Sequence, residues 1–447
     1  MIPRATYRLQ LTRDFPFSAA QRIVPYLAKL GISHIYASPI TTARRGSTHG
    51  YDGIDPTTVN PALGGEPGLR ALAADARARG MGLLLDIVPN HVAAHASNPW
   101  WQDLLRHGRR SVHADWFDVE WEAPGCEGRL WLPVLDRPLE DAVRDGVLTL
   151  GLVDGIPSLR HHTEAFPLAP DSVDAARRYI AALDDIDDPD RPSREVDKKV
   201  VDKTADLHAI IDAQAYRLAW WRTGNDQINY RRFFDISTLA GLRMECADAF
   251  HAVHALPLRL AREGVIDGLR IDHVDGLADP TGYLEQLRGA LDAAGAARGL
   301  PAGTLSLHVE KILAPGEALP AAWACDGTTG YDFMDQCGAL LHVASGEAVL
   351  QEIWVQYGGT TRVADEEWQA RREMLDGPLR TEADRCLRAL LAVVDATPHA
   401  ADLSHAMYAR ALHALLARFP VYRTYAGPEG LDAHGAAWLA RAEDAAA

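Results

Sequence analysis

The sequence predicts an α/β protein, a TIM-type (β/α) barrel that is incomplete, with about six of the eight strands that such a barrel needs. Three observations lead to this fold class. Apolar, β-type runs alternate with amphipathic stretches of helical period, which is typical of βα units and a parallel sheet. The alternation is interrupted between residues 92 and 263 by a large, mostly helical insertion after the third strand. Polar residues stand at the carboxyl ends of three expected strands, where barrel enzymes carry their active sites.

Residues 1–91 are expected to form the first part of the barrel. The elements predicted there are strands over 6–11, 32–40 and 81–91 and helices over 18–30 and 66–79. The strands are apolar on both faces, as buried strands of a parallel sheet are. This part therefore supplies the first three barrel strands.

Residues 92–263 are expected to form an inserted lobe together with the helices that return the chain to the barrel. The lobe contains the tryptophan-rich segments "NPWW" and "DWFDVEWE". A charged run over 184–203 indicates a solvated loop or an exposed helix. The segment "HAIIDAQAYRLAWWRT", residues 208–223, has the character of a long helix.

The barrel pattern resumes over residues 264–340. The elements predicted there are strands over 264–272, 304–313 and 324–333 and a helix over 280–294. Residues 341–447 are rich in Ala, Leu and Arg with helical period and contain no further strand pair. We therefore expect a helical carboxyl-terminal segment on a chain that lacks about two barrel strands, and a downstream chain as a possible partner that completes the barrel.

Composition limits the class of function. The 447 residues are 47% hydrophobic and 24% charged, as in ordinary soluble globular proteins, and the net charge is −16. A surface of this sign lacks the basic patch that nucleic acid or an anionic membrane requires. Neither is expected as a partner, and a neutral small substrate is compatible with the surface.

The cysteines and the amino terminus bear on location. Five scattered cysteines without a CxxC spacing indicate free thiols in a reducing compartment, and no metal or other cofactor is expected. The first residues, "MIPRATYRLQL", contain no apolar signal core, and no apolar run approaches the roughly 18 residues of a membrane span. We expect a cytoplasmic protein.

Three polar clusters follow three predicted strands. They are Asp86, Asn90 and His91; Arg270, Asp272 and His273; and His308, Glu310 and Lys311. Because the carboxyl ends of parallel barrel strands meet at one mouth, we expect these side chains to converge there. A single strand-end carboxylate could equally be an ion-pair partner or a helix cap, so the prediction depends on the convergence.

Asp272 and Glu310 form the pair to which we assign catalysis. Cleavage of a glycosidic bond by a retaining route needs one ionised, nucleophilic carboxylate and one protonated, acidic carboxyl group. Arg270 stands two residues before Asp272, so both lie on the same strand face. We expect the charge of Arg270 to hold Asp272 ionised.

The same segments resemble a known family. "DIVPNH", "GLRIDHVDG" and "VEKIL" resemble the first three sequence regions of the alpha-amylase family of retaining glycoside hydrolases and transglycosylases. Longer stretches resemble one branch of that family, which forms trehalose linkages on maltooligosaccharides. These stretches are "STHGYDGIDPTTVNPALGG", "AYRLAWWRTGNDQINYRRFFDISTLAGLR", "VEKILAPGEALP" and "GTTGYDF".

The resemblance implies an isomerase that moves the reducing-end glucose of a maltooligosaccharide from an α-1,4 to an α,α-1,1 linkage. Glu310 would protonate the leaving oxygen while Asp272 forms a covalent glycosyl-enzyme. The resemblance also implies roles in substrate binding for Tyr51, Asp86, His91, Arg270, His273, Trp221, Tyr230 and Asp332. Trp221 and Tyr230 would act from the inserted lobe as part of a lid, and an ordinary core helix is the alternative.

The chain also departs from the family pattern. A third carboxylate in an "HDTK"-like fourth region is missing, and Asp365, Asp376 and Asp395 match nothing in the family. Two other functions therefore stay open. One is an inactive or split glucan-binding chain, and the other is an amylase-like hydrolase.

Overall fold

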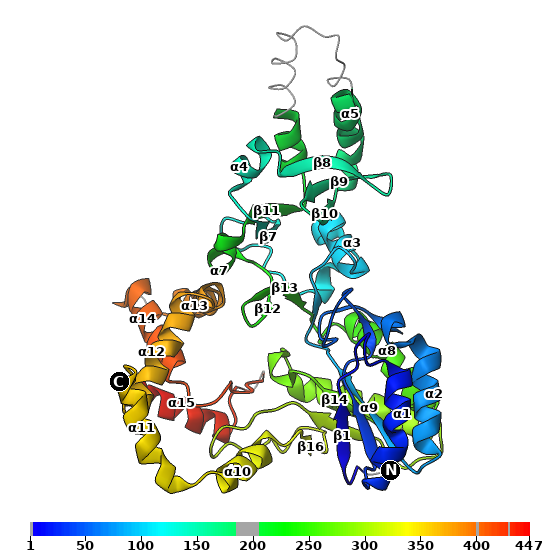
Figure 1. The fold of residues 1–447 in the computed structure, drawn as a ribbon. Coiled ribbons are helices and arrows are strands. Elements are labelled where there is room, and N and C mark those ends of the chain that lie inside the picture. Colours follow the sequence, from blue (N-terminus) through cyan, green and yellow to red (C-terminus); the bar gives the residue numbers. More distant parts are fainter. Residues whose placement is uncertain (1–2, 185–204, 399–401, 428–429) are drawn as a thin grey trace. The chain divides into compact units, whose positions relative to one another are not determined.

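The computed structural model describes four stretches of the chain, residues 3–184, 205–398, 402–427 and 430–447 (Figure 1). Nearly all of the predicted charged run at 184–203 lies outside the described residues. The chain divides into two compact units. Unit 1 comprises Met1–Tyr51, Pro56–Asn90 and Ala247–Ala447, and unit 2 comprises Asp52–Asp55 and His91–Cys246. The boundaries of the four segments expected from the sequence stay predictions.

Among the described residues, unit 1 contains one parallel sheet of six strands in the order β1-β2-β5-β14-β15-β16. The strands are β1 (Thr6–Leu9), β2 (His34–Ala37), β5 (Gly82–Ile87), β14 (Gly268–Ile271), β15 (Ser306–Val309) and β16 (Gly327–Thr328). Each falls inside a range that the sequence predicts. The incomplete six-stranded barrel is thereby confirmed, and a short hairpin of β3 (Thr41–Ala43) and β4 (Gly53–Val59) is added between its second and third strands.

The predicted helices between these strands also form. They are α1 (Phe17–Lys29), α2 (Gly65–Arg77) and α9 (Pro280–Ala296). A further helix, α8 (Ala247–Arg262), precedes β14, where the sequence predicts returning helices without bounds. Helix α1 packs on α2, and α8 packs on α9. Helix α9 begins where local chemistry favours a start. The side chain of Asp279 accepts a 2.9 Å hydrogen bond from the backbone N–H of Gly282, and Pro280 occupies the first helical turn.

A buried carboxylate, Asp267, stabilises the sheet at the amino-terminal ends of its strands. Asp267, just before β14, accepts hydrogen bonds from the backbone N–H of Leu83 at 3.1 Å, from Arg77 at 3.2 Å and from Arg298 at 3.3 Å. Gly268 follows, and a Cβ there would stand 2.1 Å from the hydroxyl of Ser306. Close strand packing therefore requires glycine at this position.

Unit 2 combines helices with small sheets. Its sheets are β7 (Leu130–Leu135) with β11 (Tyr216–Trp220); β8 (Leu148–Val153), β9 (Ile156–His161) and β10 (Glu164–Pro167); and β6 (His91–Ala93), β12 (Arg232–Phe233) and β13 (Ile236–Gly241). Its helices include α3 (Pro99–His107), α4 (Leu139–Arg144), α5 (Val173–Asp184) and α7 (Gly224–Gln227).

The prediction of a long helix over 208–223 is wrong for the second half of that range. Helical residues end at Asp212, and Tyr216–Trp220 form β11, which pairs in parallel with β7. Tyr216 is buried, and its hydroxyl donates a 2.9 Å hydrogen bond to the carbonyl of Pro167. Alanine, leucine and arginine are good helix formers, but pairing with β7 and burial of Tyr216 outweigh that weak preference.

The carboxyl-terminal part of unit 1 is helical, as predicted. It contains α10 (Tyr331–Leu341), α11 (Glu347–Gln356), α12 (Val363–Asp376), α13 (Arg380–Asp395), α14 (His405–Arg418) and α15 (Ala433–Ala446). All of α11 is exposed, including its apolar side chains. Within the described residues, no helix has the length and apolar character needed to cross a membrane.

Candidate active site

The site begins with three adjacent strands whose carboxyl ends are in register. Arg270 on β14 stands opposite Asp86 on β5 and opposite His308 on β15. Asp272 and Glu310 each follow the last residue of their strand and continue its ladder. The backbone N–H of Asp272 donates to Ile87 at 2.9 Å, and that of Glu310 donates to Ile271 at 2.8 Å. Strand pairing thus places both carboxylates at the carboxyl-terminal side of the sheet.

Arg270 joins the carboxylates of this edge. One guanidinium nitrogen, Nη1, lies 2.7 Å from Asp86 Oδ1 and 2.7 Å from Asp272 Oδ1. The other, Nη2, lies 3.0 Å from Glu310 Oε1. Arg270 and Asp272 are each 6% exposed, so these charge-assisted contacts are shielded from water. The expected convergence of the strand-end carboxylates is present in the structure.

Asp86 is held by a second cation and two tyrosines. Its Oδ2 accepts hydrogen bonds from Arg8 at 2.9 Å, from the hydroxyl of Tyr51 at 2.6 Å and from that of Tyr36 at 3.1 Å. Arg8 also donates to the Tyr51 hydroxyl at 2.7 Å and lies 4.5 Å over the ring of Tyr36. Burial, followed by the negative charge of Asp86, raises the pKa of both tyrosines, so both stay protonated donors.

Glu310 is positioned by two further donors. The backbone N–H of His273 donates to Glu310 Oε2 at 3.1 Å, and the hydroxyl of Tyr331 donates to Oε1 at 3.3 Å. His273 has a φ of 49°, in the left-handed region that few non-glycine residues adopt. This strained turn stands beside Glu310, as such conformations often do at functional sites.

The protonation of Asp272 differs from the expectation. The pKa of Asp272 is raised to about 7: burial raises it most, the charge of Arg270 lowers it, and the negative charges of Asp86 and Glu310 raise it. Arg270 thus lowers the pKa of Asp272 as expected, but desolvation outweighs the ion pair, so the prediction that this charge holds Asp272 ionised is wrong below about pH 7. Three carboxylates face two guanidinium groups here, so a single proton would balance the charge of the cluster.

Other residues of the predicted clusters do not join these carboxylates. Lys311 is fully buried and pairs instead with Glu317 at 2.9 Å and Asp275 at 3.5 Å. His308 lines a cavity of about 320 Å³ on the same face of the sheet as Arg270 and Tyr36. Burial lowers the pKa of His308, which favours its neutral form.

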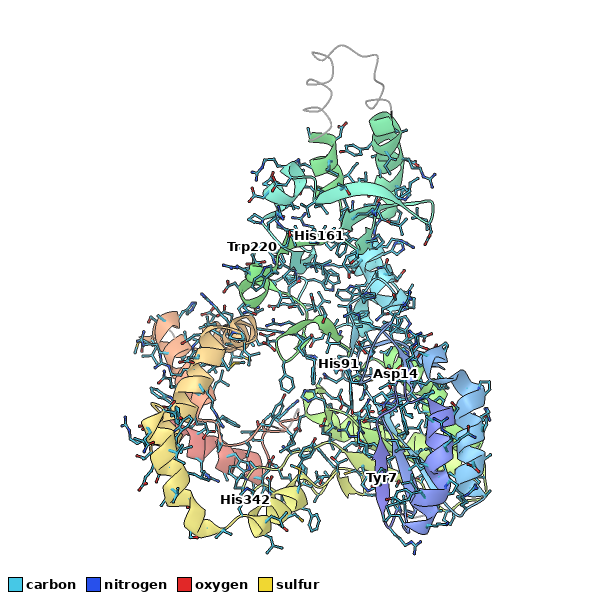
Figure 2. All side chains as sticks on the ribbon, in the orientation of Figure 1. Tyr7, Asp14, His91, His161, Trp220 and His342 are labelled. Atoms are coloured by element: carbon cyan, nitrogen blue, oxygen red, sulfur yellow. The ribbon has the colours of Figure 1, made fainter. Side chains whose placement is uncertain are left out.

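Three of the predicted substrate-binding residues belong to unit 2. His91 on β6 is buried with its ring 4.5 Å from that of Phe233, and Figure 2 labels it. Tyr230 is buried and donates to the carbonyl of Ser237 at 2.7 Å, whereas Trp221 is 57% exposed. In unit 1, Asp332 is exposed in the first turn of α10. The roles of these residues stay predictions.

Sequence reasoning missed Arg8, Tyr36 and Tyr331. Arg8 and Tyr36 are partners in the register of β1 and β2, so both project from positions that meet at the same sheet edge as Asp86. An arginine inside the apolar run "TYRLQL" was the available signal. Tyr331 stands next to Asp332 in "GTTGYDF", a segment whose only signal is its resemblance to the family.

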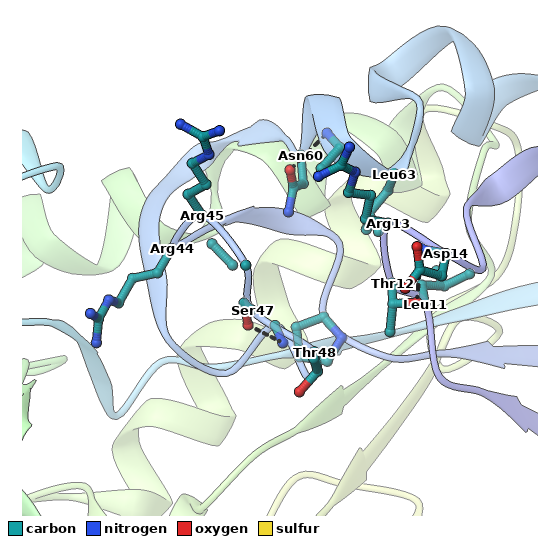
Figure 3. Close-up of a pocket in the computed structure, with 15 residues that line it drawn as sticks. Leu11, Thr12, Arg13, Asp14, Arg44, Arg45, Ser47, Thr48, Asn60 and Leu63 are labelled. Atoms are coloured by element: carbon teal, nitrogen blue, oxygen red, sulfur yellow. Dashed lines mark hydrogen bonds between the residues drawn. The ribbon is translucent and has the colours of Figure 1, made fainter.

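A larger cavity lies elsewhere in unit 1. It has a volume of about 630 Å³ and is lined by the end of the β1 segment and the loop after β3, with Arg13, Arg44 and Arg45 among its residues (Figure 3). Ser47 Oγ accepts the backbone N–H of Gly50 there at 3.0 Å. None of the carboxylates around Arg270 lines this cavity. The convergence of charged groups, not volume, therefore identifies the candidate site.

The chain is similar to known proteins over most of its length. Residues 20–137 match the family model of the alpha amylase catalytic domain. A Mycobacterium tuberculosis protein, provisionally named maltooligosyl trehalose synthase, is 39% identical over 94% of this chain, which covers 48% of that protein. The chain thus spans about half the length of the relatives that it matches.

Solved structures give the same result. Maltooligosyltrehalose synthase from Arthrobacter ramosus is 34% identical with a TM-score of 0.77, and the match covers 99% of this chain and 50% of that one. A hypothetical maltooligosyl trehalose synthase from Sulfolobus tokodaii is 27% identical with a TM-score of 0.75, over 100% of this chain and 52% of that one. The chain resembles maltooligosyltrehalose synthases of the alpha-amylase family over almost its whole length, as its motifs predict.

Proposed function

We propose that this chain carries the two catalytic carboxylates of an intramolecular transglycosylase that acts on maltooligosaccharides. The reaction converts the reducing-end α-1,4 linkage into an α,α-1,1 linkage. The observation that carries the proposal is Arg270, which holds Asp272 and Glu310 side by side at the carboxyl ends of neighbouring strands. Similarity to maltooligosyltrehalose synthases supports the choice of reaction.

The proposed reaction is a double displacement with net retention. Asp272 attacks the anomeric carbon while Glu310 donates its proton to the glycosidic oxygen, so the α-1,4 bond breaks and a glycosyl ester forms. The released glucose then turns over in its subsite. Glu310 takes a proton from its anomeric hydroxyl, that oxygen attacks the same carbon, and the ester bond to Asp272 breaks.

The charge balance of the cluster fits this assignment. Two guanidinium groups, from Arg8 and Arg270, face three carboxylates, so one proton gives a neutral site. In the productive form that proton is on Glu310, which must act as the acid, and Asp272 is ionised. Because burial raises the pKa of Asp272 to about 7, the ionised form of Asp272 that the attack requires gains population as the pH rises through this value.

The remaining site residues are proposed as contacts to the sugar. Tyr51 would form the platform at the cleavage point, and Arg270 would orient both carboxylates. The other proposed contacts are Asp86, His91, His273, Trp221, Tyr230 and Asp332. We also propose a cytoplasmic location, which the five free cysteines of the chain support.

Two other functions are distinguished by the same assay. One is an inactive or split glucan-binding chain, which would form no product by itself. An amylase-like hydrolase would release reducing sugars instead. We propose that the chain alone forms little product and that activity appears when the rest of a relative's length is supplied.

The test is product analysis on maltopentaose, with and without a polypeptide that corresponds to the rest of a relative. The active assembly should form a non-reducing product of unchanged mass, whereas hydrolysis would form glucose.

Asp272→Asn and Glu310→Gln should each lower turnover by about 10³-fold or more, since each removes a step that no neighbour supplies. Asp365→Asn is a matched control, because Asp365 is exposed and its carboxylate pairs with Arg362 at 3.0 Å. Retention of more than about a tenth of the turnover by either site variant would contradict the assignment.

A further inference from the structure

In unit 2, two histidines and one aspartate bring their polar atoms together. His161 ends β9, His162 follows it, and Asp136 follows β7; Figure 2 labels His161 within this unit. His161 Nε2 lies 3.3 Å from Asp136 Oδ1, and His162 Nε2 lies 3.3 Å from Oδ2. Among the described residues this is the single group of three His, Cys, Asp or Glu side chains whose potential metal-ligand atoms all lie within 4.8 Å of one another.

The spacing suits a metal ion better than hydrogen bonds. An N–H···O hydrogen bond has a usual donor–acceptor distance of about 2.9 to 3.0 Å, so two contacts of 3.3 Å are long. Zinc binds imidazole nitrogen and carboxylate oxygen at about 2.0 to 2.2 Å with tetrahedral geometry. The edge of such a tetrahedron is roughly 1.6 times the bond, or about 3.3 Å. Each imidazole nitrogen lies at this distance from its nearer carboxylate oxygen, His161 from Oδ1 and His162 from Oδ2.

An uncommon turn brings the two histidines to one side. Consecutive side chains of a strand point to opposite faces of a sheet, so two neighbouring residues do not normally bind the same ion. His162 has a φ of 52°, in the left-handed region, at the turn between β9 and β10. The two rings are consequently 4.3 Å apart and both approach Asp136.

The surrounding charges orient Asp136 without neutralising it completely. Arg137 contacts Asp136 Oδ1 and Oδ2 at 3.1 Å each, so the carboxylate is held in place. The same guanidinium also binds Asp145 at 3.0 Å, so two carboxylates share its charge. A carboxylate that is oriented by an outer hydrogen bond is the usual arrangement behind a metal ligand.

We propose that Asp136, His161 and His162 form a binding site for a divalent transition-metal ion of the zinc class, with water completing the coordination. Asp136 follows a strand of the β7–β11 sheet, whereas the histidines end a strand of the β8–β9–β10 sheet. The ion would tie these two sheets of unit 2 together and stabilise the unit. This site is separate from the carboxylates around Arg270 and does not depend on the proposed function.

The experiment uses the untagged full chain, freed of metal by a chelator and dialysed. Zinc binding is measured by titration calorimetry, and cobalt is used as a second probe because its visible spectrum reports tetrahedral coordination. The test variant is His162→Asn. Asparagine tolerates the left-handed conformation, so the turn is kept while the imidazole is lost. His162 is also 58% exposed, so this variant should fold.

The control is His208→Ala, which removes another imidazole of unit 2 that lies 3.0 Å from a carboxylate, that of Glu140. We expect one equivalent of zinc on the wild-type chain, a rise in thermal stability on binding, and affinity at least about tenfold weaker in His162→Asn. His208→Ala should bind as the wild type does. The proposal is overturned if the wild-type chain shows no stoichiometric binding, if His162→Asn binds as tightly, or if His208→Ala weakens binding equally.

Discussion

At the scale of single residues, Arg270 determines how the carboxylates of the candidate site share charge. Two of its three guanidinium nitrogens, Nη1 and Nη2, contact Asp86, Asp272 and Glu310 at 2.7 to 3.0 Å. The ion pair lowers the pKa of Asp272, but burial raises it by more, so the net value is about 7. A buried carboxyl group that stays protonated at mildly acidic pH makes the stability of the protein depend on pH.

Replacement of Asp272 by Asn should alter stability in a pH-dependent way. The native pKa of Asp272 is raised to about 7 from an ordinary 3.8, so between these values the native state keeps a proton that the unfolded chain releases. The stability of the wild type therefore falls as the pH rises through this window, and the variant lacks this loss. Relative to wild type, Asp272→Asn should gain roughly 1 to 3 kcal/mol in unfolding free energy between pH 5 and pH 8.

Urea unfolding of both proteins at the two pH values gives this difference. Asp365→Asn, at an exposed position on α12, should show no such change between the two pH values. If the stability difference between Asp272→Asn and wild type were the same at pH 5 and pH 8, Asp272 would not carry a raised pKa. The ion pair with Arg270 would then outweigh burial.

At the scale of elements, the two ends of β14 have different roles, one in the candidate site and the other in stability. The carboxyl end carries the candidate site, and the amino end carries Asp267, which joins Arg77 and Arg298 and accepts the backbone N–H of Leu83. In a βα barrel, buried polar groups at the amino-terminal side of the strands serve stability. Asp267 is 3% exposed, so its replacement removes a negative charge that is shielded from water and that pairs with Arg77 and Arg298.

Asp267→Asn should therefore destabilise unit 1 by roughly 2 to 4 kcal/mol, because two guanidinium groups lose a buried counter-charge. The pH dependence of stability that Asp272 causes should stay. Asp75→Asn is the matched control on α2, since Asp75 pairs with Arg79 at the surface and such pairs contribute less than about 1 kcal/mol. Equal losses for the two variants in urea unfolding would show that the cluster at Asp267 contributes no more than a surface ion pair.

At the scale of the whole molecule, the helical segment after β16 exposes apolar surface. Leu340 and Leu341 at the end of α10 are 85% and 83% exposed, and the apolar side chains of α11 are exposed as well. Within the described residues, the edge strands β1 and β16 each have one neighbour in their sheet. Apolar patches and open strand edges of this kind favour association.

We expect the mass of the purified 447-residue chain in sedimentation or light scattering to rise with protein concentration. Replacement of both Leu340 and Leu341 by Glu should lower the degree of association at a given concentration, because it adds charge to the exposed apolar surface. Leu152→Glu is the control, since Leu152 is also exposed but lies on β8 in unit 2. A monomer at all concentrations, or an equal effect of the control, would contradict this expectation.

Local signals in the sequence determined much of the fold. Apolar runs, helical period and caps depend on neighbouring residues, so all six strands of the sheet and the helices α1, α2 and α9 were predictable in place. Asp272, Glu310 and Arg270 were predictable for the same reason, because each stands in or just after a recognisable strand. Residues 216–220 were not, because good helix formers there become a strand only by pairing with β7.

Only the tertiary structure decided the contacts between residues that are distant in the sequence and the electrostatics that follow from them. Arg8 and Tyr36 reach Asp86 because three strands are neighbours in the sheet, and no local pattern records that order. The raised pKa of Asp272 depends on how much water the packed chain excludes, which its own segment does not reveal. The approach of Asp136 to His161 likewise follows from the packing of two small sheets, and a sequence pattern reports only on neighbours along the chain.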